Sequence, residues 1–387
     1  MSYKLATSTW GKEEINAIQA VIESDIYSMG EKVAEFENNT AKFFGSKYSV
    51  MCSSGSAANL LMIASLFYRS EQKIDRGDEV IVPAVSWSTT YFPLQQYGLK
   101  LKFVDIDLET LNFDLEQLKS AITSKTKVIL AVNLLGNPNN FRKIQSLIDG
   151  TDIILLEDNC ESMGAKFEDK FTGTFGLMGT FSTFFSHHIA TMEGGFILTD
   201  DEELFHLLLC LRAHGWTRNL PKKNRLVQKS EDPFYESFRF ILPGYNLRPV
   251  EMSGAIGIEQ LKKLPDFLER RKINAEYFIN KFKSDQRFIL QKEIGHSSWF
   301  GFSIILDDQS KMDRKTILKV LSKNNIDTRP IVTGNFAKNE VLKYFDYSIH
   351  GELKNSEYLD NNGFFVGNSH ENLIEQIDFL KDSLDRI

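Results

Sequence analysis

Two adjacent histidines, His187 and His188, lie in a short segment that ends in the paired-glycine turn Glu193-Gly194-Gly195. An unperturbed imidazole has a pKa near 6.5, so either ring can take up and return a proton at neutral pH. The apolar residues before the segment predict a strand, which places the histidines in the loop that follows it. The segment therefore indicates a proton-transfer site, although solvated or hydrogen-bonded histidines would also fit an isolated pair.

Carboxylates and small residues follow other predicted strands. Asp158 and Glu161 come at the end of an apolar run, and the stretch Ser53-Ser54-Gly55-Ser56-Ala57 lies between a strand and an apolar helix. Open parallel sheets bind ligands at the carboxyl ends of their strands. Glycine and serine at a helix N-terminus can bind a phosphate through free N–H groups. Each stretch alone is also typical of an ordinary cap or turn.

Trp87 follows a third predicted strand, in Pro83-Ala84-Val85-Ser86-Trp87. Its indole could stack on an aromatic ligand at the same edge of the sheet, or it could be a core residue.

The elements that must position these side chains alternate along the chain. Strands are predicted at 48–52, 79–82, 102–106, 127–132 and 153–157, and helices at 12–24, 31–44, 57–68 and 115–123. Strands that alternate with helices predict a mainly parallel sheet covered on both faces. In the first helix, Ile15, Ile18 and Ile22 mark an apolar face.

The pattern changes near Gly257. A helix containing Pro265 is followed by a predicted strand at 299–306, a helix at 314–322, a short strand near Ile331 and a closing helix marked by Leu373 and Leu384. We therefore expect two domains, a large α/β domain at 1–255 and a smaller α+β domain at 256–387.

Composition limits the possible functions. The 387 residues carry a net charge of −7, with 42% hydrophobic and 25% charged residues, which is ordinary for a globular protein. The acidic balance argues against nucleic acid as a partner. No signal peptide or membrane-spanning run is evident, and the three cysteines form no disulfide or zinc pattern. These features favour a cytoplasmic protein without a bound metal.

Taken in order, the motifs resemble the DegT/DnrJ/EryC1/StrS family of pyridoxal 5′-phosphate enzymes. Its members read roughly Phe-Ser-Phe-x-x-x-Lys-x-x-x-x-x-Glu-Gly-Gly, and here Ser182 and Glu193-Gly194-Gly195 match both ends of that pattern. The family keeps six residues between its lysine and the paired glycines, so the lysine position falls on His187. The resemblance extends from about Gly30 to Gly367. It implies the aspartate-aminotransferase-like (type I) fold, with a mainly parallel central sheet and a smaller C-terminal α+β domain.

The resemblance also implies roles for individual residues. Asp158 would keep the pyridine nitrogen of the cofactor protonated, Glu161 would approach the ring hydroxyl, and Trp87 would stack on the ring. The phosphate-binding set would be Gly55, Ser56, Ala57 and Ser182, joined by Asn246 from the neighbouring subunit of a homodimer. The residues considered for contacts with substrate are His214, Arg218, Arg248 and Arg329, and their division between glutamate and the sugar nucleotide stays open.

The missing lysine implies a particular reaction. Histidine cannot form the Schiff base that anchors the cofactor, but it can transfer protons. The segments resemble a branch of the family in which the cofactor acts as pyridoxamine 5′-phosphate, regenerated by L-glutamate. That branch removes the C3 hydroxyl of GDP-4-keto-6-deoxymannose and releases ammonia. The nucleotide and the sugar configuration are implied by the resemblance alone.

Three alternatives remain at this point. A nucleotide-sugar aminotransferase would need a lysine before Gly194, and Lys166, Lys170 and Lys222 are out of frame. A related dehydratase with an iron–sulfur cluster would need a set of cluster cysteines, which three scattered cysteines do not provide. The third alternative is a non-catalytic binding protein that retains the fold.

Overall fold

The computed structural model describes residues 1–71, 74–308, 310 and 312–387. Its largest element is a mixed sheet with strand order β1-β9-β8-β5-β4-β2-β3-β12. All pairs from β8 to β12 are parallel, whereas β9 is antiparallel to both of its neighbours. The strands are β1 (Tyr48–Cys52), β2 (Glu79–Pro83), β3 (Lys100–Val104), β4 (Thr126–Val132), β5 (Ile154–Asp158), β8 (Met178–Ser182), β9 (Gly195–Thr199) and β12 (Tyr347–Ile349).

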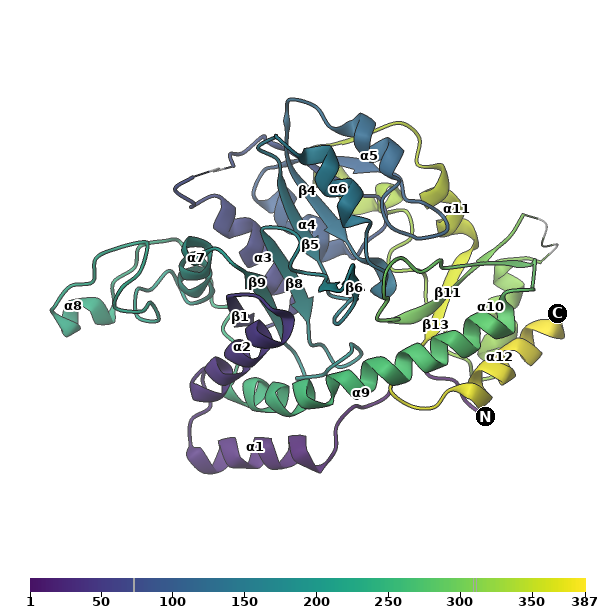
Figure 1. The fold of residues 1–387 in the computed structure, drawn as a ribbon, viewed down its shortest axis with the longest axis horizontal. Coiled ribbons are helices and arrows are strands. Elements are labelled where there is room, and N and C mark those ends of the chain that lie inside the picture. Colours follow the sequence, from purple (N-terminus) through teal and green to yellow (C-terminus); the bar gives the residue numbers. More distant parts are fainter. Residues whose placement is uncertain (72–73, 309, 311) are drawn as a thin grey trace.

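Helices cover this sheet and extend beyond it (Figure 1). They are α1 (Lys12–Ser24), α2 (Glu31–Phe44), α3 (Gly55–Leu66), α4 (Ser88–Gln96), α5 (Leu115–Ala121), α6 (Phe141–Ile148), α7 (Glu202–Arg212), α8 (Pro233–Ser237) and α9 (Glu251–Phe282). A small hairpin of β6 (Lys166–Phe167) and β7 (Lys170–Phe171) and the short 3₁₀ helix η1 (Leu134–Gly136) lie among the connections. The α/β fold with a mainly parallel sheet is therefore confirmed.

The smaller C-terminal part has its own antiparallel sheet, in the order β10-β11-β13. Its elements are β10 (Phe288–Leu290), β11 (Gly301–Leu306), α10 (Arg314–Lys323), α11 (Lys354–Asn362), β13 (Gly363–Gly367) and α12 (Ile374–Asp385), with 3₁₀ helices η2 (Phe336–Lys338) and η3 (Glu340–Tyr344). The strand expected near Ile331 is absent from the described residues. In its place Arg329 makes an isolated bridge with Phe365. The chain turns at Val332, whose φ is +49°, and a strand does not continue through such a turn.

The division at residue 255 stays a prediction. Three segments connect the two predicted parts. Helix α9 runs without interruption from Glu251 to Phe282, with Pro265 inside it. Strand β12 adds an edge to the large sheet. At the other end of the chain, Tyr3 is buried in the core of the smaller part and donates a hydrogen bond to the Gly367 carbonyl at 2.7 Å.

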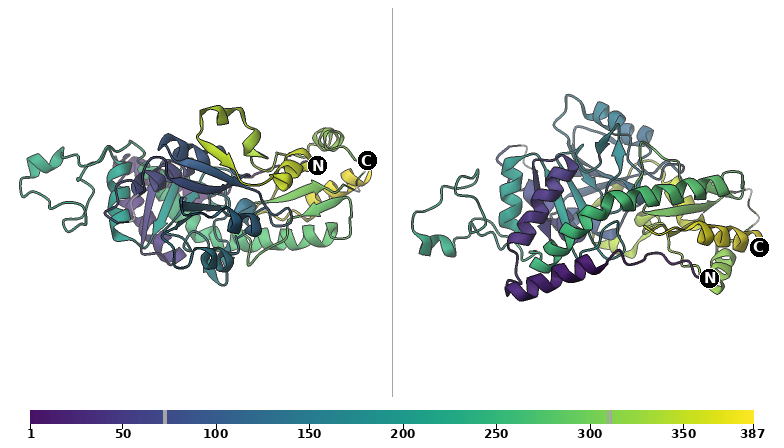
Figure 2. Two further views of the ribbon diagram at one scale, coloured as in Figure 1. Left: turned by 90° about the horizontal axis from the view of Figure 1, so that it is seen from above. Right: turned by 60° about the horizontal axis from the view of Figure 1, so that its bottom comes forward.

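Helix α1 packs against α9, and the right-hand view of Figure 2 shows the two helices beside each other. Its bounds agree with the sequence prediction, but its buried residues are Glu14 and Val21. The side chains of Ile15 and Ile22 are 59% and 50% exposed. Two of the three isoleucines of the predicted apolar face are therefore exposed, Ile18 is half-buried, and a carboxylate is buried where an apolar side chain was expected.

Residues 217–245, here called the arm, project from one end of the molecule and carry α8 (Figure 1). The arm returns to the sheet at Leu247, whose carbonyl accepts a hydrogen bond from the Ser53 amide at 3.0 Å. This contact places the segment after the arm beside the carboxyl end of β1, next to the N-terminus of α3.

Candidate active site

Asp158 is the last residue of β5, and its carboxylate is almost fully buried. One oxygen accepts hydrogen bonds from Asn59 Nδ2 and Thr90 Oγ1, each at 2.8 Å, and the other accepts the Cys160 amide at 3.1 Å. Asn59 belongs to α3 and Thr90 to α4. Two helices therefore fix one carboxylate at the carboxyl edge of the sheet.

The N-terminus of α3 lies against the end of β8. A Cβ on Gly55 would lie 2.7 Å from the Cβ of Ser182 and 2.9 Å from Cys160 Sγ, so only glycine fits there. The Ser54 hydroxyl accepts the Ala57 amide at 3.0 Å. Within the part of the chain that the structure describes, the amides of Gly55 and Ser56 have no acceptor. These free amides and the Ser182 hydroxyl suit an anion, which the helix dipole also favours.

Trp87 immediately precedes α4, and its side chain is 57% exposed. It is not a core residue. The preceding carbonyl, of Ser86, accepts a hydrogen bond from Thr333 Oγ1 at 2.7 Å. Because Thr333 belongs to the C-terminal part, the indole lies where that part meets the large sheet.

The two histidines occupy different environments in the loop between β8 and β9. His188 is fully buried, and its Nε2 donates to the Ser298 carbonyl at 3.0 Å. His187 is partly buried, and its ring meets the edge of Phe300 at 5.2 Å between centroids. The Nδ1 atom of His187 is buried without a partner among the described residues. The Nδ1 atom of His188 is likewise buried without a partner among those residues. The two histidines differ in that the His188 ring is bonded to a backbone carbonyl and fully buried, whereas the His187 ring is only partly buried.

Burial and the nearby Arg271 guanidinium lower the pKa of His187 to about 4. The imidazole is consequently neutral at pH 7 and can accept a proton. Arg271 lies on α9, is almost fully buried, and donates to the carbonyls of Trp299, Phe300 and Asn368. Sequence reasoning missed Arg271, because nothing local in α9 distinguishes it from its neighbour Arg270.

Glu161 lies beyond Asp158 and accepts the Leu135 amide at 3.1 Å. Burial, together with the charge of Asp158, raises the pKa of the Glu161 carboxyl to about 7. The Leu135 carbonyl in turn accepts the Phe300 amide at 3.0 Å. Glu161 is thus linked through Leu135 to the aromatic ring that packs on His187.

A second cluster surrounds Trp216. The guanidinium groups of Arg218 and Arg248 lie 5.6 Å and 5.8 Å from its ring centroid, and the His214 ring lies at 4.8 Å. Arg248 also donates to Asn246 Oδ1 at 3.0 Å. Four of the predicted residues therefore gather around one tryptophan that the sequence did not single out.

Arg329 lies apart from this cluster. Its backbone pairs with Phe365 beside β13, its side chain is exposed, and it has no side-chain contact with the Trp216 cluster within the described residues. Asn246 is also exposed, on the segment after the arm. The sheet edge thus brings together Gly55, Ser56, Trp87, Asp158 and Ser182, while Asn246 and Arg329 face outward.

These features fit pyridoxal 5′-phosphate. Free amides at a glycine-rich helix start suit its phosphate, an exposed indole suits its ring, and a buried carboxylate suits its pyridinium nitrogen. The unpartnered Nδ1 of His187 adds a nitrogen able to exchange protons. Among the described residues, no group of three or more histidine, cysteine or acidic side chains is arranged to hold a metal.

Comparison with known proteins gives consistent results. Residues 8–376 match the DegT/DnrJ/EryC1/StrS aminotransferase family. The chain is 63% identical over 386 residues to GDP-4-keto-6-deoxy-D-mannose 3-dehydratase of Escherichia coli O55:H7, covering 99% of this chain and 100% of the relative. A crystal structure of GDP-4-keto-6-deoxymannose-3-dehydratase with a trapped PLP-glutamate geminal diamine is 62% identical, with a TM-score of 0.98 over 99% of this chain and 100% of the other.

Two variants of such a dehydratase, called ColD, are equally similar in structure. In one, a histidine is replaced by asparagine and GDP-perosamine is bound (62% identity, TM-score 0.98, over 99% of this chain and 100% of the other). In the other, a serine and the histidine directly after it are replaced by asparagine and lysine (62% identity, TM-score 0.97, over 98% of this chain and 100% of the other).

Proposed function

This chain belongs to the DegT/DnrJ/EryC1/StrS aminotransferase family, and we propose that it is a pyridoxal-phosphate-dependent GDP-4-keto-6-deoxy-D-mannose 3-dehydratase. It removes the C3 hydroxyl of its GDP-linked 4-keto-6-deoxy sugar and uses L-glutamate to regenerate the amine form of the cofactor. Identity of 63% over the whole length supports both the reaction and the substrate class.

The observation that carries the proposal is the imidazole of His187 in the loop after β8. No lysine occurs between Ser182 and Gly195. In the doubly substituted relative, a serine directly precedes the exchanged histidine. Here Ser186 precedes His187, whereas His188 is preceded by another histidine. Together with the burial of His188, this pattern supports His187 as the residue that replaces the family lysine.

Each residue of the site then has a task. The amides of Gly55 and Ser56 and the Ser182 hydroxyl bind the cofactor phosphate. Trp87 stacks on the ring, and the Asp158 carboxylate holds a proton on the pyridine nitrogen. When bound, the cofactor supplies an electron-accepting ring conjugated to the sugar through its amine.

His187 moves the protons of the reaction. Its neutral ring nitrogen removes a proton from the C4′ carbon of the cofactor and then donates it to the hydroxyl that leaves C3 of the sugar. A general base of this kind typically contributes about 10²–10⁴-fold to the rate. The low pKa of His187 keeps the imidazole in its base form before substrate binds.

The Trp216 cluster supports binding of the sugar nucleotide. Arg218 and Arg248 bring two guanidinium groups to one indole, and guanidinium groups bind phosphate oxygens strongly. His214 lies beside them. We assign these three residues to binding of the sugar nucleotide. Arg329 lies apart from the Trp216 cluster, and its assignment to glutamate or to the sugar nucleotide stays open.

The proposal is tested by incubating the protein with pyridoxal phosphate, L-glutamate and a panel of nucleotide-linked 4-keto-6-deoxy sugars. We expect ammonia and a product that is lighter than the substrate by the mass of one oxygen atom, because the C3 hydroxyl is replaced by hydrogen. An amino sugar as product would favour the aminotransferase alternative. No ammonia with any sugar would favour a non-catalytic binding protein.

We propose that the active enzyme is a homodimer with shared sites. The arm exposes large apolar side chains, with Phe234 at 88% and Phe238 at 69%, and Tyr235 and Phe240 are also exposed. Clusters of this kind mark protein contacts. Asn246, at the base of the arm, would reach the phosphate site of the partner. Sedimentation at micromolar concentration tests this proposal, because a monomeric active enzyme would contradict it.

The cytoplasm remains the predicted location. Helices long and apolar enough to traverse a bilayer do not occur among the described residues.

A further inference from the structure

The loop at residues 183–194, which carries His187, is closed at its base by hydrogen bonds between its own residues and by one from α9. The Thr183 amide donates to the Gly194 carbonyl at 2.9 Å, and the Thr191 amide donates to the Thr183 carbonyl at 2.8 Å. The Ser253 hydroxyl, on α9, donates to the Thr191 carbonyl at 3.1 Å. These bonds close the base of the loop but do not reach the residues directly after the histidines.

Ala190, three residues after His187, is held by side chains from two distant parts of the chain. The Trp10 indole Nε1 donates to its carbonyl at 2.8 Å, and Gln260 Oε1 accepts its amide at 3.0 Å. Trp10 lies 180 residues away and Gln260 lies 70 residues away. Both backbone groups of one loop residue are therefore taken by side chains outside the loop.

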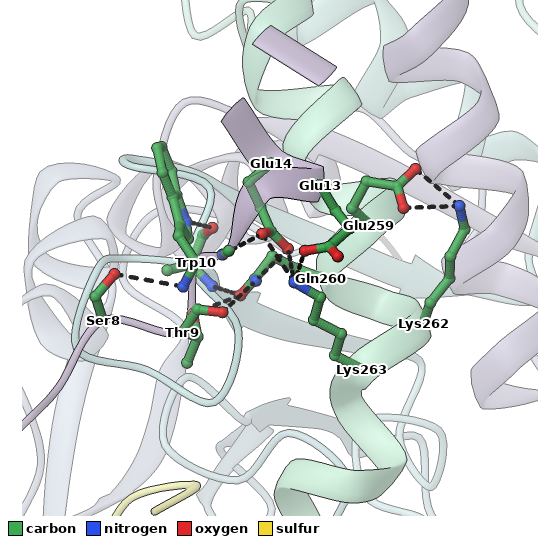
Figure 3. Close-up of polar contacts among 11 residues, drawn as sticks. Ser8, Thr9, Trp10, Glu13, Glu14, Glu259, Gln260, Lys262 and Lys263 are labelled. Carbon is green, nitrogen blue, oxygen red and sulfur yellow. Dashed lines mark hydrogen bonds and ion pairs between the residues drawn. The ribbon is translucent and has the colours of Figure 1, made fainter. Parts of the chain in front are cut away.

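Gln260 is itself held in place (Figure 3). Its Oε1 also accepts the Thr9 hydroxyl at 2.6 Å, and its Nε2 donates to the Thr9 carbonyl at 3.1 Å and to Glu14 Oε1 at 2.8 Å. The side chain is fully buried. Because both ends of the amide are bonded, Gln260 has one orientation available, and that orientation presents an acceptor to Ala190.

Glu14 completes this network from α1. It is fully buried, accepts the Gly11 amide at 2.6 Å, and pairs with Lys263 at 2.8 Å. Pairing with a cation and hydrogen bonds from further donors are the conditions under which a buried carboxylate is tolerated. This explains why α1 buries a glutamate against α9 while Ile15 and Ile22 are exposed.

We propose that Trp10 and Gln260 are positioning residues for His187: by holding Ala190 they fix the loop that directs its imidazole. The kinetic test of this proposal rests on the proposed function, whereas its hydrogen-exchange test does not. The same helix, α9, supplies Arg271, which holds the carbonyl of Phe300, whose ring packs on His187. Residues of the N-terminal segment and of α9 thus both contribute contacts to the loop and to the aromatic ring beside the imidazole.

The first variant is Trp10→Phe, which removes the N–H donor and keeps an aromatic ring. Misplacement of a catalytic group by about 1 Å can lower the rate up to about 100-fold, so we expect kcat to fall about 10- to 100-fold. The KM for the sugar nucleotide and the affinity for pyridoxal phosphate should stay unchanged. Gln260→Met removes both the acceptor oxygen and the donor nitrogen of the amide and keeps a side chain of similar size. It should have the same effect on kcat.

Tyr3→Phe is the matched control. Tyr3 also belongs to the N-terminal segment and donates one buried side-chain hydrogen bond to a backbone carbonyl, but that carbonyl belongs to Gly367. We expect it to lower the thermal midpoint as much as Trp10→Phe does, with kcat unchanged. Equal losses of kcat in the two variants would assign Trp10 a purely structural role and overturn the proposal.

Hydrogen exchange provides a measurement that does not depend on activity. Amides of the 183–194 loop should exchange faster in Trp10→Phe and Gln260→Met than in the native protein, and at the native rate in Tyr3→Phe. Unchanged exchange in the first two variants would also overturn the proposal. If the native protein lacked dehydratase activity but the exchange pattern held, the proposed function would fail while the positioning contacts stood.

Discussion

Replacing His187 with asparagine is expected to lower kcat for loss of the C3 hydroxyl by about 10³-fold or more, the upper part of the range for a general acid–base group. Asparagine is similar in size to part of the imidazole but cannot exchange protons at neutral pH. Binding of pyridoxal phosphate should be unchanged, because under the proposed function the contacts with its phosphate, ring and pyridine nitrogen are assigned to Gly55, Trp87 and Asp158. Steady-state kinetics and the cofactor absorbance measure the two effects.

His188→Asn is the comparison for this variant. His188 is fully buried and bonded to the Ser298 carbonyl, so its loss should destabilise the fold by about 1–3 kcal/mol and leave kcat close to the native value. A relative with a histidine-to-asparagine change binds GDP-perosamine, which supports a folded, ligand-binding His187→Asn protein. If His187→Asn turned over at the native rate, the base would have to be another residue, with His188 and His214 the first to test.

The second large effect is expected for Asp158→Asn, which should lower kcat about 10²–10³-fold. Losses of this size are seen when a single charge-stabilising group is removed from an active site. A neutral amide cannot keep the pyridine nitrogen protonated, so the cofactor loses most of its capacity to accept electrons. The fold should survive, because the oxygen of the introduced amide can still accept hydrogen bonds from Asn59 and Thr90. Kinetics and the cofactor absorbance, which reports ring protonation, are the measurements.

Asp105→Asn serves as its control. Asp105 is another buried carboxylate, just after β3, that accepts the amides of Asn355 and Ser356 and lies outside the site. Its replacement should lower stability without changing the cofactor absorbance or kcat. A native-like absorbance and rate in Asp158→Asn would show that the pyridine nitrogen has a different partner.

Local sequence patterns were enough to predict most of the fold and the central residues of the site. Asp158 and Ser182 end strands, and Gly55 begins a helix, so strand and turn patterns were enough to place them at one sheet edge. The bounds of α1 and α2 also followed from their sequence patterns. Strand β12, three residues long and exposed, has no pattern that a sequence reading could detect.

What the sequence did not reveal depends on contacts between distant residues. Arg271, Gln260 and Trp10 act on the histidine loop from 70 or more residues away, and nothing in their local pattern marks them. The orientation of α1 was missed for a related reason. Its isoleucine face looked like the buried one, but the partner of Glu14 is Lys263, 249 positions later.

The central claim is that an imidazole, and no lysine, occupies the position at which the general pattern of the family has its cofactor-anchoring lysine. It is tested by reducing the protein–pyridoxal phosphate complex with borohydride and mapping the digested peptides by mass spectrometry. The account predicts that no lysine carries the reduced cofactor and that the cofactor is released on denaturation. A cofactor-modified lysine peptide in stoichiometric yield would contradict it.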